Sequence, residues 1–103
     1  MTRHVNTWFI TGASSGLGLA FAEKALEEGD QVVLAARSRQ AMKAVVACFP
    51  DMALAIEMDI TDRPQRTTAV RGAEAHFGRI DVLVNNAGVD FLGAIDGESV
   101  TWR

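Results

Sequence analysis

Short apolar runs alternate along this chain with stretches in which apolar residues recur every three or four positions. The short runs predict four strands, and their continuous apolar character fits parallel strands covered on both faces, at residues 5–10, 31–36, 53–58 and 81–85. The intervening stretches predict three helices, at residues 16–28, at residues 39–47, and from Thr61 or Asp62 to residue 77. Strands that alternate with helices favour βαβ units with right-handed crossovers and a parallel sheet.

The ends and the buried faces of these helices follow from particular residues. Ser38 is expected to cap the second helix, and Gly29 and Gly78 to end the first and the third. The buried face of the first helix is predicted at Leu17, Ala20, Phe21 and Ala25. That of the third helix is predicted at Ala69, Val70, Ala73 and Phe77.

The composition narrows the class of protein. Hydrophobic residues make up 49% and charged residues 22% of the 103 positions, as in a soluble globular domain. The net charge is −3 and no block of Lys or Arg occurs, so neither nucleic acid nor a membrane surface is an expected partner. No stretch approaches the roughly 18 apolar residues of a membrane span.

Cysteine and histidine leave little room for redox or metal chemistry. The single Cys48 excludes an intramolecular disulfide and metal sites built on several thiolates. Because it lies in an apolar stretch, we expect a buried structural thiol. His4 and His76 lack ligand-like spacing and are expected at the surface. These features predict no metal site and fit a reducing, cytoplasmic setting.

Three glycines, Gly12, Gly16 and Gly18, lie between the first apolar run and the first helical stretch. Their spacing, G-x-x-x-G-x-G, matches neither G-x-G-x-x-G nor the P-loop. Glycine nevertheless lets a backbone approach a pyrophosphate, and the following helix offers free N–H groups and a positive dipole end. Ser14 and Ser15 would add hydroxyl donors to phosphate oxygens. The alternative is a glycine-rich turn that holds no ligand.

Together with the alternating elements, this turn predicts an incomplete Rossmann-like fold with a doubly wound α/β sheet. Residues 1–103 are expected to form one domain. The element order is β-α-β-α-β-α-β and the expected strand order is 3-2-1-4. The fourth strand would then present an unpaired apolar edge, open to self-association or to a partner chain. In residues 88–103 the periodicity fades, which predicts a loop and, from Ser99, the first turn of an unfinished helix.

The residue after the second strand bears on the choice of cofactor. A dinucleotide site carries an acidic residue there for the ribose of NAD, or an arginine for the 2′-phosphate of NADP. This chain has Arg37 and no carboxylate, which favours NADP over NAD. The alternative is a solvent-exposed arginine without a ligand.

Together with Asp59 after the third strand and the run Asn85-Asn86-Ala87-Gly88 after the fourth, the motif at residues 11–18 resembles the short-chain dehydrogenase/reductase family, in its amino-terminal half. The resemblance implies that Gly12 to Gly18, Leu17 included, hold the pyrophosphate, and that Arg37 selects NADP. It implies that Asp59 and the backbone of Ile60 meet the adenine ring. Asn86, Ala87 and Gly88 would line the adenosine ribose. Taken alone, Asp59 is equally a helix-capping residue, and the asparagines a self-satisfied turn.

The resemblance does not extend to catalysis. The family uses a serine and a Tyr-x-x-x-Lys pair to move a hydride between NADPH and a carbonyl or hydroxyl carbon, and this sequence contains no tyrosine. No catalytic residue is therefore predicted. The chain is expected to bind the dinucleotide weakly and to be inactive alone, with a small-molecule substrate only in a full-length form. The alternatives are a non-catalytic nucleotide-binding or partner-pairing module and a truncated gene remnant.

Overall fold

The computed structural model describes residues 4–14, 16–86 and 101–102, and its strands and helices alternate along the chain. The strands are β1 (Thr7–Thr11), β2 (Gln31–Ala36), β3 (Ala53–Glu57), β4 (Val82–Val84) and β5 (Thr101–Trp102). The helices are α1 (Gly16–Glu27), α2 (Arg39–Cys48) and α3 (Arg63–Phe77). All predicted strands and helices are present, with ends that differ from the prediction by at most two residues.

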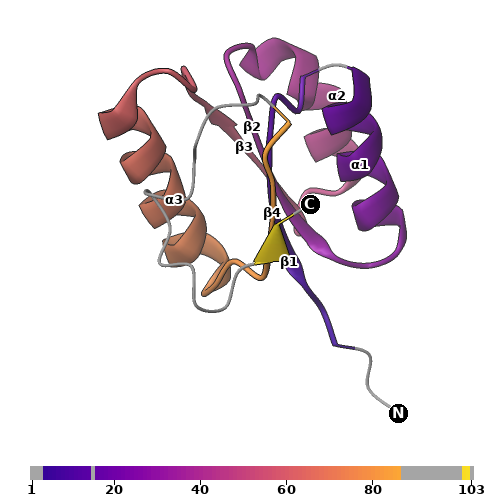
Figure 1. Ribbon diagram of the computed structural model, residues 1–103. Coiled ribbons are helices and arrows are strands. Elements are labelled where there is room, and N and C mark those ends of the chain that lie inside the picture. The colour runs from indigo at the N-terminus through magenta and orange to yellow at the C-terminus, as the bar shows by residue number, and fades with distance from the viewer. Residues whose placement is uncertain (1–3, 15, 87–100, 103) are drawn as a thin grey trace.

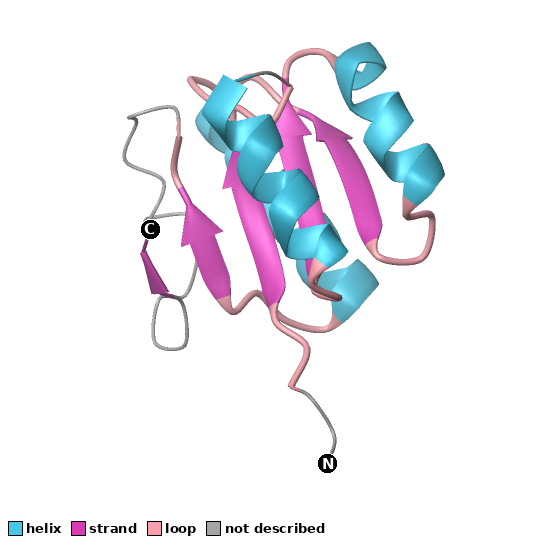
Figure 2. Ribbon diagram, turned by 90° about the vertical axis from the view of Figure 1, so that its right-hand side faces the viewer, coloured by secondary structure: helices cyan, strands magenta, loops and turns pink. Residues whose placement is uncertain are grey.

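The strands form one parallel sheet in the order β3-β2-β1-β4-β5. Helices α1 and α2 cover one face of the sheet and α3 covers the other (Figure 1). The predicted doubly wound α/β fold and the strand order 3-2-1-4 are therefore confirmed. Figure 2 shows the strands side by side, so that their carboxyl ends meet along one edge of the sheet.

Strand β5 corrects two expectations about the end of the chain. Thr101 and Trp102 form a strand instead of belonging to the first turn of a helix, and they pair with Val82 and Leu83. The edge of β4 is therefore not left open along its whole length. A single helical turn fixes several backbone dihedrals for one hydrogen bond, whereas the edge of β4 offers donors and acceptors already in place. The other predictions for residues 87–100 lie outside the described residues.

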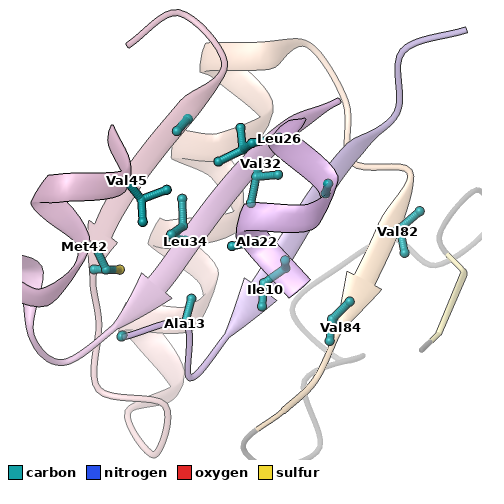
Figure 3. Packing of buried hydrophobic residues seen from close by; sticks show 13 residues of the cluster. Ile10, Ala13, Ala22, Leu26, Val32, Leu34, Met42, Val45, Val82 and Val84 are labelled. Carbon is teal, nitrogen blue, oxygen red and sulfur yellow. The ribbon is translucent and has the colours of Figure 1, made fainter. Parts of the chain in front are cut away.

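The core consists of two layers, because successive residues of each strand point to opposite faces. Between the sheet and helices α1 and α2 lie Ile10, Val32, Leu34, Leu26 and Met42 with their neighbours (Figure 3). On the other face, Phe9, Val33 and Leu83 pack against Ala69, Val70 and Ala73 of α3. The predicted buried face of α3 is thus confirmed, with Phe77 partly buried beside it.

The predicted face of α1 is wrong except for Ala25. The buried residues are Gly18, Ala22, Ala25 and Leu26, whereas Leu17 is 63% and Phe21 40% exposed, and Ala20 is exposed too. Apolar residues occur on more than one side of this helix, so the helical period alone does not select one stripe. The helix turns Gly18 toward the end of β1, because the two elements come too close there for any larger residue.

Cys48 is exposed, contrary to the expectation of a buried thiol. Helix α2 buries Met42 and Val45, and Phe49, seven residues after Met42, packs against the same core cluster. Phe49 therefore occupies the place on the buried face that the apolar stretch had indicated for Cys48. His4 and His76 lie at the surface, as expected.

The predicted caps are present. The Ser38 hydroxyl accepts a hydrogen bond from the Ala41 N–H, and Gly78 ends α3 in the left-handed conformation. Asp62, one of the two predicted alternatives, caps α3 by accepting from the Gln65 N–H. Within the described residues, none of the three helices is long and apolar enough to cross a membrane.

Candidate functional site

The turn from β1 into α1 has a backbone conformation that requires glycine. Gly12 and Gly16 have φ angles of 64° and 58°, in the left-handed region that side chains with a Cβ rarely adopt. A Cβ built on Gly16 would meet no atom within 4 Å, so the space in front of the turn is open. Helix α1 begins at Gly16 with no acidic residue in its first turn, which leaves its positive end uncompensated by the helix itself.

Gly18 is required for a different reason. A Cβ on Gly18 would lie 2.4 Å from the Gly12 carbonyl oxygen and 3.0 Å from Asn86 Nδ2. The first turn of α1 therefore lies directly against the end of β1, at a distance that only glycine permits. This contact sets the position of the helix N-terminus over the carboxyl edge of the sheet.

Thr11 and Asn86 join the ends of β1 and β4 beneath the turn. Thr11 is fully buried, and its hydroxyl accepts a hydrogen bond of 3.0 Å from the Asn86 N–H. The same hydroxyl donates toward Val84 O at 3.4 Å and Asn85 Oδ1 at 3.3 Å. Asn86 Nδ2 donates to Gly12 O at 3.4 Å. The amide of Asn86 is thus engaged with the glycine turn itself.

An open cavity of about 210 Å³ lies at the carboxyl ends of β1, β2 and β3. Its lining consists of Gly12, Ser14, Ala35, Ala36, Arg37, Met58 and Ile60. In open parallel sheets, ligands bind in such crevices outside the carboxyl ends of the strands. A larger cavity of about 650 Å³ lies beside β3 and α2 and is lined by none of the predicted site residues. The smaller cavity is the candidate site, because the glycine turn opens onto it.

Arg37 and Asp59 form an ion pair at the rim of this cavity, with Arg37 Nη2 donating to Asp59 Oδ1 at 3.3 Å. The Arg37 side chain is 74% exposed. The same carboxylate oxygen accepts hydrogen bonds from the Thr61 hydroxyl at 2.7 Å and the Thr61 N–H at 2.9 Å. These two bonds, together with the Arg37 charge, hold the pKa of the Asp59 carboxyl below its ordinary value.

The predicted site residues fall into three groups. The first group lines the cavity and consists of Gly12, Ser14, Arg37 and Ile60, with Asp59 beside it as the ion-pair partner of Arg37. Gly16, Leu17 and Gly18 form the start of α1, and Asn86 contacts Gly12. Ser15, Ala87 and Gly88 lie outside the described residues.

Four residues of the site had not been selected from the sequence. Ala35, Ala36 and Met58 line the cavity, and Thr11 connects the two central strands beneath it. Ala35, Ala36 and Met58 lie at the carboxyl ends of predicted strands and Thr11 directly follows one, which is a signal the sequence contained. Ala35, Ala36 and Met58 carry no charged or hydrogen-bonding side-chain group, and the partners of the Thr11 hydroxyl lie more than 70 positions away in the chain, so motif spacing did not distinguish them.

The comparisons with known proteins agree on one family. The family model described as short chain dehydrogenase matches residues 6–102. Oxidoreductase BOA17 of Botryotinia fuckeliana is 43% identical over 90 residues, which cover 86% of this chain and 33% of that protein. The chain thus spans about a third of the length of the curated relatives it matches.

Solved structures of short-chain dehydrogenases and reductases superpose on the chain. A short-chain dehydrogenase from Streptomyces avermitilis has a TM-score of 0.79 at 46% identity, over 82% of this chain and 31% of the other. The 3-ketoacyl-(acyl-carrier-protein) reductase of Brucella melitensis, complexed with NADH, has a TM-score of 0.73 at 34% identity, over 77% and 32%. An actinorhodin polyketide ketoreductase with NADPH has a TM-score of 0.74 at 30% identity, over 82% and 34%.

Proposed function

Because the chain belongs to the short-chain dehydrogenase family, which binds NAD(P) cofactors, we propose that it holds the adenosine and pyrophosphate half of NADP(H) in the cavity beside the glycine turn. The observation that carries this proposal is the position of Arg37, at the rim of a cavity that also contains Gly12 and Ser14. In a full-length relative the bound nicotinamide would exchange a hydride with a carbonyl or hydroxyl carbon.

The turn supports the pyrophosphate part of the proposal. The open space at Gly16 gives a phosphate access to the first N–H groups of α1, where the helix dipole favours negative charge. The Ser14 hydroxyl lines the same cavity and adds a donor. Asn86 serves the site indirectly, because its hydrogen bonds hold the glycine turn to the end of β4.

The end of β2 supports NADP over NAD. No carboxylate follows β2 at the position that would bind a ribose 2′-hydroxyl, and a guanidinium matches the geometry of a phosphate. Asp59 opposes this preference in part, since it already neutralises some of the Arg37 charge. We infer that a 2′-phosphate binds the Arg37 nitrogen atoms left over by the single bond to Asp59.

The chemistry assigned to this chain is binding and orientation. The cofactor supplies the hydride, and the residues described here hold its adenosine end. We propose no catalytic residue in this chain, because the tyrosine of the family's Tyr-x-x-x-Lys pair has no counterpart in the sequence.

Titration of the purified chain with NADPH and with NADH tests the proposal. NADPH is expected to bind more tightly, and Arg37→Ala to raise its Kd about tenfold, the lower end of the range for a charge-assisted hydrogen bond because Arg37 is exposed. The Kd of NADH should stay unchanged. Arg39→Ala is the matched control, since Arg39 is an exposed arginine two residues along the chain that does not line this cavity. Equal binding of the two cofactors by the wild-type chain would contradict the role of Arg37.

A second variant tests the turn separately from the selectivity. Gly16→Asp places a carboxylate at the start of α1, where it repels a pyrophosphate, and aspartate tolerates the left-handed conformation better than most residues do. Binding of both cofactors is expected to disappear. Cofactor binding that survives this substitution would place the pyrophosphate elsewhere.

A further inference from the structure

The loop between β3 and α3 forms one wall of the candidate site. Met58 and Ile60 line the cavity, and Asp59 between them holds Arg37 at its rim. Both the shape of the wall and the position of the cation therefore depend on the conformation of this loop.

The first turn of α3 anchors the loop at successive backbone groups. Arg66 Nη1 donates to the Ile60 carbonyl oxygen at 2.6 Å, and Gln65 Oε1 accepts from the Asp59 N–H at 2.8 Å. Between these two contacts, the Asp62 N–H donates to Asp59 O at 3.0 Å. The three consecutive peptide groups around Asp59 and Ile60 each have a fixed partner.

We propose that Arg66 is a positioning residue for the adenosine half of the cofactor, acting through the Ile60 carbonyl, with Gln65 in a supporting role through Asp59. The inference rests on the proposed function and deepens it. Arg66 is only partly exposed, and its guanidinium makes a charge-assisted hydrogen bond of 2.6 Å to the Ile60 carbonyl. No motif marked either residue, because their roles depend on where α3 begins.

The two residues act on different parts of the ligand. Arg66 holds the wall at Ile60, which faces the adenosine common to both cofactors. Gln65 holds the backbone of Asp59, the residue that orients Arg37 toward the 2′-phosphate. Loss of the Arg66 contact therefore weakens the binding of both cofactors equally. Loss of the Gln65 contact selectively weakens the binding of the cofactor that carries the 2′-phosphate.

The experiment measures Kd by calorimetry for adenosine 2′,5′-bisphosphate and for 5′-AMP, on the whole chain. Arg66→Met is expected to raise both values by the same factor, about fivefold, which is less than the roughly tenfold of a lost direct bond because Arg66 acts on the ligand through the loop. Arg66→Lys, which can still donate to the Ile60 carbonyl, should restore part of the affinity. Gln65→Leu should raise the Kd of the bisphosphate alone. Arg63→Met is the control, because Arg63 lies in the same helical turn, carries the same charge and is exposed.

Thermal unfolding of each variant separates positioning from general stability, since Kd is compared at a temperature where every variant is folded. Unchanged Kd values in Arg66→Met, or an equal loss in Arg63→Met, would overturn the inference while leaving the proposed function intact. A wild-type chain that binds neither nucleotide would overturn both.

Discussion

Replacing glycine by alanine should lower the Tm at Gly18, where the start of α1 touches the end of β1, and raise it at Gly72, where the space is open. Gly18→Ala puts a Cβ 2.4 Å from the Gly12 carbonyl oxygen, although non-bonded heavy atoms ordinarily meet at about 3.5–4.0 Å. The obstructing atom belongs to the backbone of the turn, so the helix must move as a unit. Asn86, which donates to the same carbonyl, is displaced with it.

The magnitude follows from two opposing terms. Overpacking a well-packed site costs about 1–3 kcal/mol, and a backbone obstruction this close belongs at the upper end. Alanine recovers at most about 1 kcal/mol through its better helix propensity. The net loss is about 2 kcal/mol. With an unfolding entropy of about 2.1 cal/mol/K per residue over 103 residues, this lowers Tm by about 9 °C.

Gly72→Ala is the matched control, because Gly72 is also helical and a Cβ there meets nothing within 4 Å. Only the propensity term acts, so Tm should rise by about 2–5 °C. Circular dichroism melts of the wild type and the two variants provide the measurement. If Gly18→Ala melted at or above the wild-type temperature, the close packing of α1 on the glycine turn would be refuted.

Three further substitutions test the hydrogen bonds around the site. Thr11→Val removes the buried acceptor of the Asn86 N–H and should cost about 1–3 kcal/mol, measured by urea unfolding. Asp62→Ala removes the N-cap of α3 and should cost about 1 kcal/mol in the same assay. Asp59→Asn should flatten the pH dependence of stability below pH 3.8, the ordinary pKa of the group. Hydrogen bonds from Thr61 lower the pKa of Asp59 in the folded state. The stabilisation from this carboxylate is therefore complete above pH 3.8 and is lost as the pH falls through the folded-state pKa.

The first two of these predictions each have a matched control variant. Thr67→Val removes a hydroxyl bonded only to a neighbouring helical carbonyl and should change stability by less than about 0.5 kcal/mol. Asp51→Ala removes an exposed carboxylate that caps no helix and should be equally mild. A steeper loss of stability in acid for Asp59→Asn than for the wild type would reverse the sign assigned to this carboxylate.

Most of the fold was predictable because its determinants act over short distances in the sequence. Continuous apolar runs and helical periods located the first four strands and the three helices. Their alternation indicated a parallel sheet, and the dinucleotide-binding turn indicated the strand order. Ser38 caps the start of α2 and Gly78 the end of α3, through hydrogen bonds to residues three and four positions away. The glycine turn was recognised for the same reason, since its three glycines lie within seven positions, and in the structure Gly12 and Gly16 have φ angles of 64° and 58°.

The errors arose where packing chooses between locally equivalent options. Helix α1 has apolar residues on more than one side, and only its approach to the Gly12 carbonyl selects the stripe that contains Gly18. Phe49 fills the place expected for Cys48 because it fits the core beside Val45. Thr101 and Trp102 form a strand because the edge of β4 supplies their partners.

The candidate site divides along the same line. The sequence by itself determined which residue types follow the strands, including Arg37 after β2 and Asp59 after β3. Only the tertiary structure decided that these two pair with each other and that Asn86 bonds to the glycine turn. The reason is physical: a local conformation depends on neighbours in the chain, whereas a hydrogen bond across 22 or 74 positions exists only once the sheet has brought its carboxyl ends together.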